Sequence, residues 1–349
     1  MSREQANKIV EDLKKRLESG KELLTASFGE LLSTLIETLQ LSRDKRFVFL
    51  LIGRTGVGKS STVNSLMGKQ IAQVGNYDPT TMGVESYDSE INGVEFTIID
   101  TPGLCDDIPE KGNDQKYIEL IRSKATHIDS IWFVTRLDDP RVTPDEMRGI
   151  KIISEAFSPQ AWEHAVIIFT RANKADDYLV DLQERTKRVQ DEIAKHTGKE
   201  IATNIPSVAI DNKSKTTPDG KQWLGNLYTK VFVRMSERGS MPFIMATAHR
   251  INASKISGVT GKPNWRFYGA SDSQHDTNVE NNNEDTESGF NPFEFDEEQK
   301  REIRKKLIEL VPTLAVAGAA VGGGLGGPIG AAIGGAVGAA IGSIFYFFS

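Results

Sequence analysis

The sequence has a single cysteine, Cys105, and no excess of positive charge. One cysteine cannot form an internal disulfide, so the chain fits a reducing compartment or is indifferent to redox conditions. The net charge of −6 gives no electrostatic reason to expect a nucleic-acid partner, because nucleic-acid-binding surfaces are usually basic. The first residues alternate charged and single aliphatic side chains, without the apolar core that a secretory signal needs. We therefore expect a chain that is not exported and that binds no nucleic acid.

The amino-terminal part differs in pattern from the middle of the chain. Residues 3–42 carry aliphatic side chains at mostly helical spacing, with Glu and Lys on the other face, which predicts one or two amphipathic helices in an N-terminal segment 1–43. This apolar stripe either packs on the domain that follows or binds another copy or a partner. Residues 270–298 are rich in Asp, Glu, Asn and Ser and poor in aliphatics. Such a segment cannot bury enough surface to fold alone, so we assign 239–298 to a linker that is acidic and disordered in its second half.

The carboxyl-terminal part has the opposite composition. Beyond Glu309 no side chain is charged, and glycines recur at every fourth position from Gly318 to Gly342. Positions four apart lie on one side of a helix, so these glycines would form a ridge that another helix can approach closely. The stretch exceeds the roughly 20 residues needed to span a bilayer core, and the Lys and Arg cluster before it favours the cytosol for everything upstream. We expect residues 299–349 to form a basic helix and a membrane anchor, either one tilted helix or a hairpin turning at Pro328.

The middle of the chain, residues 44–238, alternates short apolar runs with helical patterns. The runs FVFLLIG, VEFTIID, SIWFVT, HAVIIFT and IPSVAI are typical of buried strands. Helical patterns lie between them, near 59–67, 113–126, 144–157, 177–195 and 221–236. This alternation predicts an α/β domain with a mainly parallel sheet and helices on both faces. Ligands of such domains bind at the carboxyl ends of the strands.

A phosphate-binding loop follows the first of these strands. The stretch GRTGVGKS fits G-x-x-x-x-G-K-[ST] and lies between a strand and a helix, as a P-loop must. Glycines allow positive φ and lack Cβ atoms, so successive backbone amides can close around phosphates. Lys59 should reach the β and γ phosphates, and the Ser60 hydroxyl should bind Mg²⁺. The residues expected to hold the nucleotide here are Gly53, Thr55, Gly56, Val57, Gly58, Lys59, Ser60 and Ser61.

A second motif, in the stretch TRANKADD, indicates which base is bound. Asn173, Lys174 and Asp176 follow a strand in the N-K-x-D arrangement of guanine readers. The Asp176 carboxylate only accepts hydrogen bonds, so it can take both the N1–H and the exocyclic amine of guanine, and adenine offers neither donor on that edge. An unpaired buried carboxylate would cost at least about 1 to 3 kcal/mol. Asn212, after the last strand, is placed where it could also contact the base.

Two further stretches complete the expected site. In IDTPGL, Asp100 ends a strand and should hold Mg²⁺ through water, while the Gly103 amide can contact a γ phosphate. In YDPTTMGVES, either Thr80 or Thr81 could coordinate Mg²⁺ in the triphosphate state, and we favour Thr81. The expected cofactors are therefore GTP or GDP with Mg²⁺.

The set GRTGVGKSSTVNSLMG, IIDTPGL and FVTRLDDPRVTPDEMRGIKIISEAF resembles the paraseptin-type GTPases. These comprise the AIG1 or immunity-associated group and the chloroplast import receptors of the Toc34 and Toc159 type, in the septin-like part of the TRAFAC class. The resemblance covers about residues 44–238. It implies an AIG1-type G domain that binds GTP and Mg²⁺ and pairs through its nucleotide face, and a carboxyl-terminal membrane anchor. The acidic tether and the glycine ridge are not features of import receptors.

Hydrolysis is expected to be slow. Ras-like enzymes orient water with a glutamine after the switch II glycine, and here Leu104 takes that position. An arginine from a second subunit can raise the rate about 10³- to 10⁵-fold. By resemblance, Arg141 matches the arginine that import receptors extend across the dimer. Arg136 is the second choice, and Arg54 could act within its own subunit.

These features predict a GTPase switch, anchored at a membrane through its tail with the G domain in the cytosol. In this hypothesis GTP orders the segments around Thr81 and Gly103 and creates a surface for a homodimer or a partner. The alternative is a septin-like GTP-binding scaffold whose assembly at a membrane, rather than turnover, is the output. A third hypothesis makes the glycine-rich tail the effector, as a membrane-perturbing or self-associating element.

Overall fold

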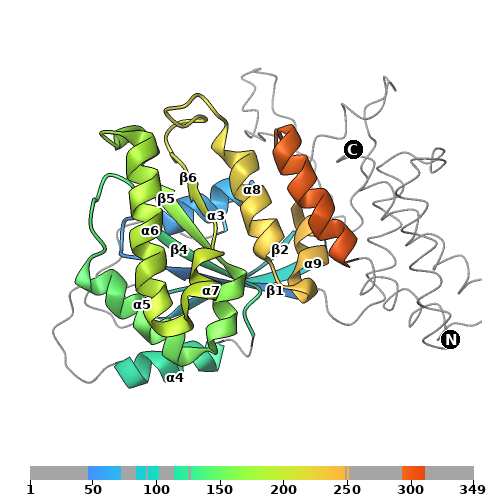
Figure 1. Cartoon of the computed structure of the whole chain (residues 1–349). Helices are drawn as coiled ribbons and strands as arrows, with labels where there is room; N and C mark the ends of the chain where they lie inside the picture. The colour runs from blue at the N-terminus through green and yellow to red at the C-terminus, as the bar shows by residue number, and fades with distance from the viewer. Residues whose placement is uncertain are drawn as a thin grey trace, which may run out of the picture.

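The computed structural model describes residues 46–71, 84–91, 93–101, 114–124, 127–247, 250 and 293–310. These residues form a central sheet with helices on both faces (Figure 1). The predicted N-terminal helices and the glycine-rich anchor lie outside this part of the chain. Within it, no helix combines the length and the apolar character that crossing a bilayer requires.

The strands and helices follow the alternation seen in the sequence. The strands are β1 (Arg46–Ile52), β2 (Glu85–Ile91), β3 (Val94–Asp100), β4 (Ser130–Arg136), β5 (Ala165–Thr170) and β6 (Ser207–Ala209). The helices are α3 (Lys59–Met67), α4 (Asp114–Lys124), α5 (Pro144–Ala156), α6 (Tyr178–Thr197), α7 (Lys199–Thr203), α8 (Trp223–Arg234) and α9 (Glu237–Thr247), with short 3₁₀ turns η1 (Pro159–His164) and η2 (Ala172–Lys174). Residues 297–310 form a further helix.

The sheet order is β2-β3-β1-β4-β5-β6, and every pair is parallel except β2 with β3. β1 lies between β3 and β4, so the chain leaves β1 towards one edge of the sheet and later returns to its other side. A ligand in an open α/β sheet binds at such a topological switch point, outside the carboxyl ends of the strands. The topology therefore marks the loop after β1 as the candidate site.

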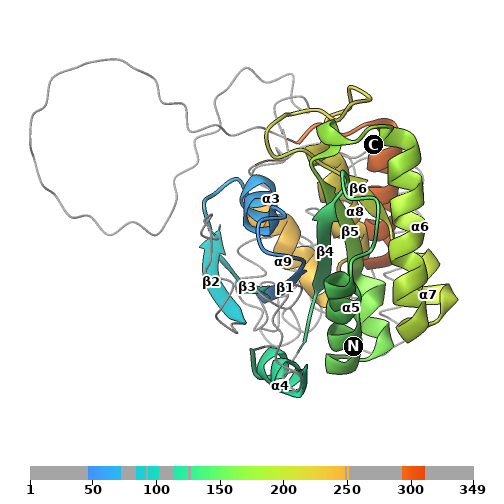
Figure 2. The same cartoon turned by 90° about the vertical axis from the view of Figure 1, so that its left-hand side faces the viewer.

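Alternate residues of the central strands pack on opposite faces of the sheet. Phe47, Phe49 and Leu51 of β1 belong to the core beneath α3, α8 and α9. The intervening residues Val48 and Leu50 belong to the core beneath α4, α5, α6 and α7. Figure 1 shows α5 and α6 on one side of the sheet and α8 and α9 on the other, and Figure 2 shows the same arrangement turned by 90°. The two-sided burial explains why the strands read as continuous apolar runs rather than as alternating ones.

The mainly parallel α/β fold is confirmed, and each of the five predicted strands is present. The antiparallel edge strand β2 was not predicted. Its sequence ESYDSEI has only one aliphatic side chain, and its residues alternate between half-buried and exposed positions. The strand β2 forms because β3 offers an open hydrogen-bonding edge. The composition of β2 alone does not predict a strand.

Helix α9 differs from the prediction, since residues 239–247 were assigned to the linker. All of these residues are buried, and the Phe243 ring lies 5.8 Å from Phe47 and 5.9 Å from Phe49. Pro242 inside the helix removes one backbone donor and weakens the local helical signal. Burial against β1 outweighs that local preference, so the folded domain extends past residue 238.

The segment 293–310 returns to this domain after the linker. The Phe293 amide donates to the Arg250 carbonyl at 2.7 Å, and the Phe293 ring lies 4.6 Å from the Tyr228 ring. The segment thus begins by pairing with the residue at the other end of the linker. Its first aromatic side chain becomes part of the core of the domain.

The helix 297–310 then runs beside α8 (Figure 1). Its residues Ile303, Leu307 and Leu310 are buried in the same core as α8 and α9. Lys230 of α8 forms an ion pair with Glu302 at 2.8 Å. The predicted basic helix before the anchor therefore has one face packed on the domain.

We predict that Leu307→Ala lowers the free energy of unfolding by about 2 to 5 kcal/mol, because it empties a buried site. Leu307 is 2% exposed, whereas its neighbour Ile308 is 41% exposed and serves as the matched control. Ile308→Ala should change stability by about 0.5 kcal/mol or less. Urea unfolding of the full chain measures both variants. Equal stabilities of the two variants would contradict the packing of this helix on the domain.

Candidate functional site

The loop after β1 forms a tight turn at the switch point of the sheet. Three of its glycines have positive φ, namely Gly53 at 149°, Gly56 at 74° and Gly58 at 106°. A Cβ on Gly53 would lie 2.1 Å from the Val134 carbonyl oxygen of β4, so only glycine fits there. The turn ends at Lys59, where α3 begins, and the helix N-terminus adds its partial positive charge. This arrangement suits an anion such as phosphate.

A buried ion pair lies under this turn. Lys59 Nζ donates to the carbonyl of Gly53 at 2.8 Å and lies 3.4 Å from Asp100 Oδ1, and both side chains are 6% exposed. Burial raises the pKa of Asp100, and the nearby Lys59 charge opposes that rise. Since Lys59 follows β1 and Asp100 ends β3, the parallel pairing of these strands brings the two charges together.

The carboxylate of Asp100 fits a role in holding a divalent cation. Its Oδ1 is buried and has no hydrogen-bond partner among the described residues. The Ser60 hydroxyl comes from the first turn of α3, directly after Lys59. Carboxylate and hydroxyl oxygens are the ligands that Mg²⁺ prefers. Thr80, Thr81 and Gly103, which were predicted to complete this part, lie outside the described residues.

The turn after β5 contacts the P-loop through a residue that was not predicted. Thr170, the last residue of β5, donates from Oγ1 to the Val57 carbonyl at 2.7 Å. A Cβ on Gly58 would meet the Thr170 methyl at 3.4 Å, so the two loops are in contact. Arg171, with φ 58°, then turns the chain into η2.

The predicted base-reading residues lie along this same turn. The Asn173 amide donates to Asp211 Oδ2 at 3.2 Å, and its side chain donates to the Thr216 carbonyl at 3.1 Å. Lys174 and Asp176 are exposed. Asp176 stands next to Asp177, whose side chain caps α6. Asn173 is thus fixed by the neighbouring loop, and Asp176 presents its carboxylate to solvent.

The turn after β6 closes the site from the other side. Asn212 donates from Nδ2 to Thr62 Oγ1 of α3 at 3.1 Å, and the same nitrogen would lie 3.0 Å from a Cβ on Gly58. The buried carboxylate of Asp211 accepts from the backbone amides of Asn173 and Lys213 and so joins the two turns. The structure therefore brings Asn212 to the P-loop and adds Asp211, which was not predicted. The contact of Asn212 with a base stays a prediction.

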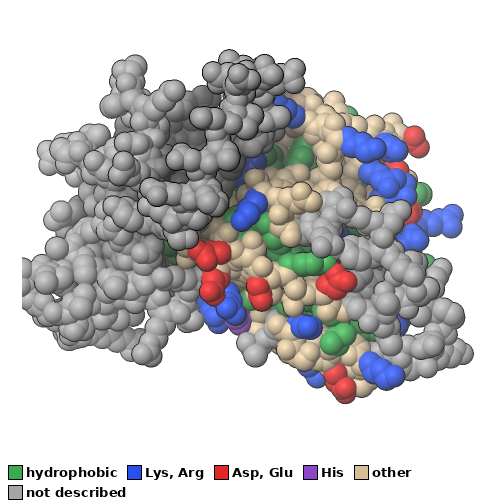
Figure 3. Space-filling view, turned by 180° about the vertical axis from the view of Figure 1, so that it is seen from behind, with side chains coloured by type: hydrophobic (Ala, Val, Ile, Leu, Met, Phe, Trp, Pro, Cys, Tyr) green, Lys and Arg blue, Asp and Glu red, His purple; other side chains and the backbone are tan. Residues whose placement is uncertain are grey.

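Basic side chains are visible near this edge on one face of the molecule. In Figure 3, Lys and Arg side chains gather over the upper right of the described surface. The carboxyl ends of the parallel strands point towards the top of the same view, as Figure 1 shows. Asp and Glu side chains lie among the Lys and Arg side chains, so this part of the surface carries both signs of charge.

Arg141 lies on the loop between β4 and α5 and is exposed. The loop is held at both sides, because the Leu137 amide donates to the Thr170 carbonyl at 2.9 Å and Arg188 donates to the Pro140 carbonyl. Arg136, the second choice, makes two hydrogen bonds to Asp138 at 2.8 and 2.7 Å. This pairing raises the pKa of Arg136 and commits its guanidinium to its own loop. Arg141 is therefore the more exposed of the two arginines.

A buried network lies beneath that loop. Glu146 accepts from the Thr143 amide at 2.9 Å and from Thr135 Oγ1, and it thereby caps α5. Arg185 of α6 is 1% exposed, donates to Thr135 Oγ1 at 3.1 Å and lies 3.8 Å from Glu146. Breaking the Glu146–Arg185 pair would leave an uncompensated buried charge. The pair therefore holds Glu146 in place, and Glu146 lies in the first turn of α5. The Thr143–Glu146 capping box has a local signature in the sequence, T-x-x-E, but the contacts with Thr135 and Arg185 have none.

Comparisons with known proteins bear on this arrangement. Residues 47–260 match the AIG1 family. The chain is 28% identical over 203 residues to the translocase of chloroplast 34 of Arabidopsis thaliana, covering 52% of this chain and 63% of the relative. It is 34% identical over 127 residues to GTP-binding protein A of Dictyostelium discoideum, covering 36% of this chain and 28% of the relative.

Among solved structures, Toc33 from Arabidopsis thaliana in complex with GDP and Mg²⁺ aligns with a TM-score of 0.45 and 24% identity, covering 65% of this chain and 94% of that one. The chain spans between 8% and 63% of the length of the curated relatives compared.

We predict that two glycine substitutions in the P-loop differ in cost. Gly56→Ala should lower the free energy of unfolding by about 1 to 2 kcal/mol, because only its positive φ is strained and nothing lies within 4 Å of the new Cβ. Gly53→Ala should cost about 1 to 3 kcal/mol more, because its Cβ collides with the backbone of β4. Thermal unfolding without nucleotide measures both, and the reverse ranking would contradict the described turn.

Proposed function

This chain belongs to the AIG1 family, and on that premise we propose that it binds GTP with Mg²⁺, hydrolyses it slowly and acts as a nucleotide-dependent switch. The observation that carries the proposal is the Lys59–Asp100 pair under a glycine turn at the switch point of the sheet. A phosphate-bearing ligand needs the amides and the lysine, and its metal needs the carboxylate. The name of the relative GTP-binding protein A supports the same conclusion.

Each part of the site has a role in this proposal. The amides from Gly53 to Ser61 bind the phosphates, and Lys59 turns from the Gly53 carbonyl to the β and γ phosphates. Ser60 and Asp100 hold Mg²⁺, with Thr81 or Thr80 and the Gly103 amide joining in the triphosphate state. The ion neutralises charge on the phosphates. Before the ligand arrives, Lys59 compensates the buried Asp100, which would otherwise be an unpaired charge.

Guanine is read from the turn that follows β5. In this proposal Asp176 accepts the N1–H and the amine of the base, with Asn173 and Lys174 beside it and Asn212 on the opposite side. The contacts of Asn173 with Asp211 and Thr216 support the proposal, because they hold the reading turn against the turn that carries Asn212. A preorganised turn loses little entropy when the base binds.

Hydrolysis depends on a second copy of the chain in this proposal. The two nucleotide faces pair, and Arg141 reaches the phosphates of its partner. The anchored loop and the buried Glu146–Arg185 pair support this role, because they fix the base of the loop while Arg141 stays exposed. The alternative, a septin-like scaffold, uses the same surface but turns nucleotide over at a near-zero rate.

We also propose that the domain is anchored at a membrane through residues 311–349, with the G domain in the cytosol. The uncharged, glycine-rich sequence of that stretch supports the proposal. The packed helix 297–310 would then lead directly from the domain into the anchor. In this division the G domain comprises residues 44–247 together with the returning segment 293–310.

Base selectivity tests the first part of the proposal. Wild-type protein with Mg²⁺ should bind GDP and not ADP, and Asp176→Asn should bind xanthosine diphosphate in place of GDP. The amide offers one donor and one acceptor, which suits the xanthine edge, so the preference should change by roughly tenfold to over a hundredfold. Calorimetric titration of protein stripped of nucleotide with EDTA measures all three ligands.

Two variants serve as controls in that titration. Lys59→Ala removes a phosphate contact, so it should weaken GDP and xanthosine diphosphate equally. Asn173→Asp tests the neighbouring position as the reader. If Asp176→Asn leaves selectivity unchanged while Asn173→Asp alters it, Asp176 is not the base reader, and a wild-type chain that takes up no guanine nucleotide overturns the function itself.

The concentration dependence of turnover tests the second part. Phosphate release per molecule should rise with protein concentration, and Arg141→Ala should abolish the rise, because an arginine supplied by a partner contributes up to about 10³- to 10⁵-fold. Arg301→Ala, an exposed arginine on the helix 297–310, is the control and should behave as wild type. A flat, near-zero rate together with nucleotide-dependent assembly would instead favour the scaffold.

A further inference from the structure

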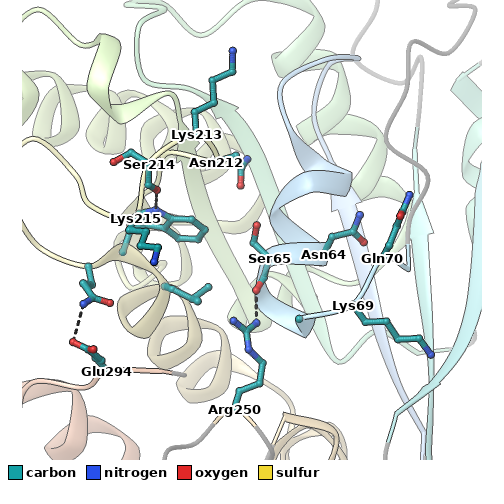
Figure 4. Close-up of a pocket in the computed structure, with 14 residues that line it drawn as sticks. Asn64, Ser65, Lys69, Gln70, Asn212, Lys213, Ser214, Lys215, Arg250 and Glu294 are labelled. Atoms are coloured by element: carbon teal, nitrogen blue, oxygen red, sulfur yellow. Dashed lines mark hydrogen bonds between the residues drawn. The ribbon is translucent and has the colours of Figure 1, made fainter. Parts of the chain in front are cut away.

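A pocket of about 690 Å³ lies between α3 and the start of α8. One wall is formed by α3 with the turn after it, and the other by residues 212–215 and the first residues of α8. Arg250 and Glu294, from the two ends of the linker, form its floor. Figure 4 shows Ser65 on one side of this space and Ser214 with Lys215 on the other, with Arg250 below. Its size falls within the range of small-molecule sites in proteins.

The pocket is distinct from the proposed nucleotide site. No residue from Gly53 to Ser61 lines it, nor do Asn173 and Asp176. Among the described residues, Asn212 is the member of the proposed nucleotide site that lines the pocket, and its side-chain amide donates to Thr62. The pocket therefore borders the proposed nucleotide site at Asn212.

The lining is strongly biased towards positive charge. Among the described lining residues, the basic side chains are Lys69, Lys213, Lys215 and Arg250, and the one acid is Glu294, which accepts a hydrogen bond from Gln222 at 2.7 Å. Figure 4 shows Lys69 and Lys213 extending outward from opposite walls. A cleft lined by one sign of charge focuses the field and attracts ligands of the opposite sign.

Arg250 is the fixed charge of this set. It is 3% exposed, its guanidinium donates to the Ser65 and Leu66 carbonyls, and it lies 4.6 Å from the centre of the Phe293 ring. Burial lowers the pKa of Arg250 to about 10, so it remains charged at neutral pH. The Arg250 side chain packs against Gly68 at the end of α3, because a Cβ on Gly68 would lie only 3.0 Å from it.

The uncharged residues of the lining indicate which other chemical groups the pocket can bind. The Trp223 indole is held by its bond to the Ser214 carbonyl at 2.7 Å, and with Leu224 it makes one wall apolar. Side-chain amide groups of Asn64, Gln70 and Gln222 also line the pocket, and that of Gln222 donates to Glu294. Lysines and arginine with amide donors suit phosphate groups, and the apolar wall suits a ring that carries them.

We propose that this pocket binds a ring compound bearing several phosphate groups, either free in solution or as the headgroup of a lipid. The ligand lies between α3 and the 212–215 turn, with its phosphates on the three lysines and its ring against Trp223. The site exists only when both Arg250 and Glu294 are in place, so the return of the segment 293–310 completes it. This inference goes beyond the proposed function and does not depend on it.

Two probes test the proposal on the full chain saturated with GDP and Mg²⁺. Calorimetry with inositol trisphosphate tests the soluble source. Sedimentation with phosphatidylcholine vesicles containing phosphatidylinositol bisphosphate tests the lipid source, against vesicles of equal charge containing phosphatidylserine. Binding of either phosphorylated probe in preference to phosphatidylserine supports the site and identifies its source. The same measurements without nucleotide keep the test separate from the nucleotide-binding proposal.

Charge reversal assigns the binding to this pocket. The double variant Lys69→Glu with Lys215→Glu changes one exposed lysine on each wall and should weaken binding at least about tenfold. Lys221→Glu is the matched control, because Lys221 is exposed on the same loop but does not line the pocket, and it should weaken binding less than about twofold.

The unfolding midpoints of both variants should equal that of the wild type, since Lys69, Lys215 and Lys221 are all exposed. The proposal is overturned if wild-type protein binds neither phosphorylated probe, or if Lys221→Glu weakens binding as much as the double variant.

Discussion

The arrangement of the site depends on a buried ion pair that the sheet must accommodate. Lys59 and Asp100 are both shielded from water, and each would be costly to bury alone. Their pairing requires β1 and β3 to be parallel neighbours in register, and it requires the loop after β1 to fold back over its own strand. That fold-back is possible because Gly53 lets the backbone pass against the Val134 carbonyl of β4. The Lys59–Asp100 ion pair thus depends on the positions of β1, β3 and β4 and of the loop after β1.

Helix α3 connects this site with the end of the described chain. Its first turn follows the P-loop, and its last carbonyls accept hydrogen bonds from Arg250. Arg250 in turn pairs with Phe293, the start of the segment that packs on α8. The guanidinium satisfies carbonyls that have no partner within the helix, and its positive charge suits the negative end of the helix dipole. The proposed nucleotide site and the returning segment are therefore supported by the two ends of one short helix.

The sequence-based predictions were accurate where the interactions join residues close together in the chain, and they failed where the interactions join distant residues. The strand–turn–helix around GRTGVGKS was predicted because its glycines, lysine and apolar strand are contiguous, and the structure confirms its helix from Lys59 to Met67. Thr170 was missed because its contact with Val57 joins residues 113 positions apart and carries no local pattern. β2 was missed for a related reason, since its pairing with β3 rather than its own composition stabilises it.

By itself the sequence determined the order of the five parallel strands and of the main helices that alternate with them, the place of the phosphate-binding loop and the residue types available at it. These properties arise from local periodicity and from the conformational freedom of glycine. Tertiary structure alone decided that Asp211 joins the turns after β5 and β6, that α9 and residues 293–310 complete the core, and that a cationic pocket forms beside α3. Those outcomes depend on burial and charge pairing between segments far apart in the chain, and such contacts exist only after the chain has folded.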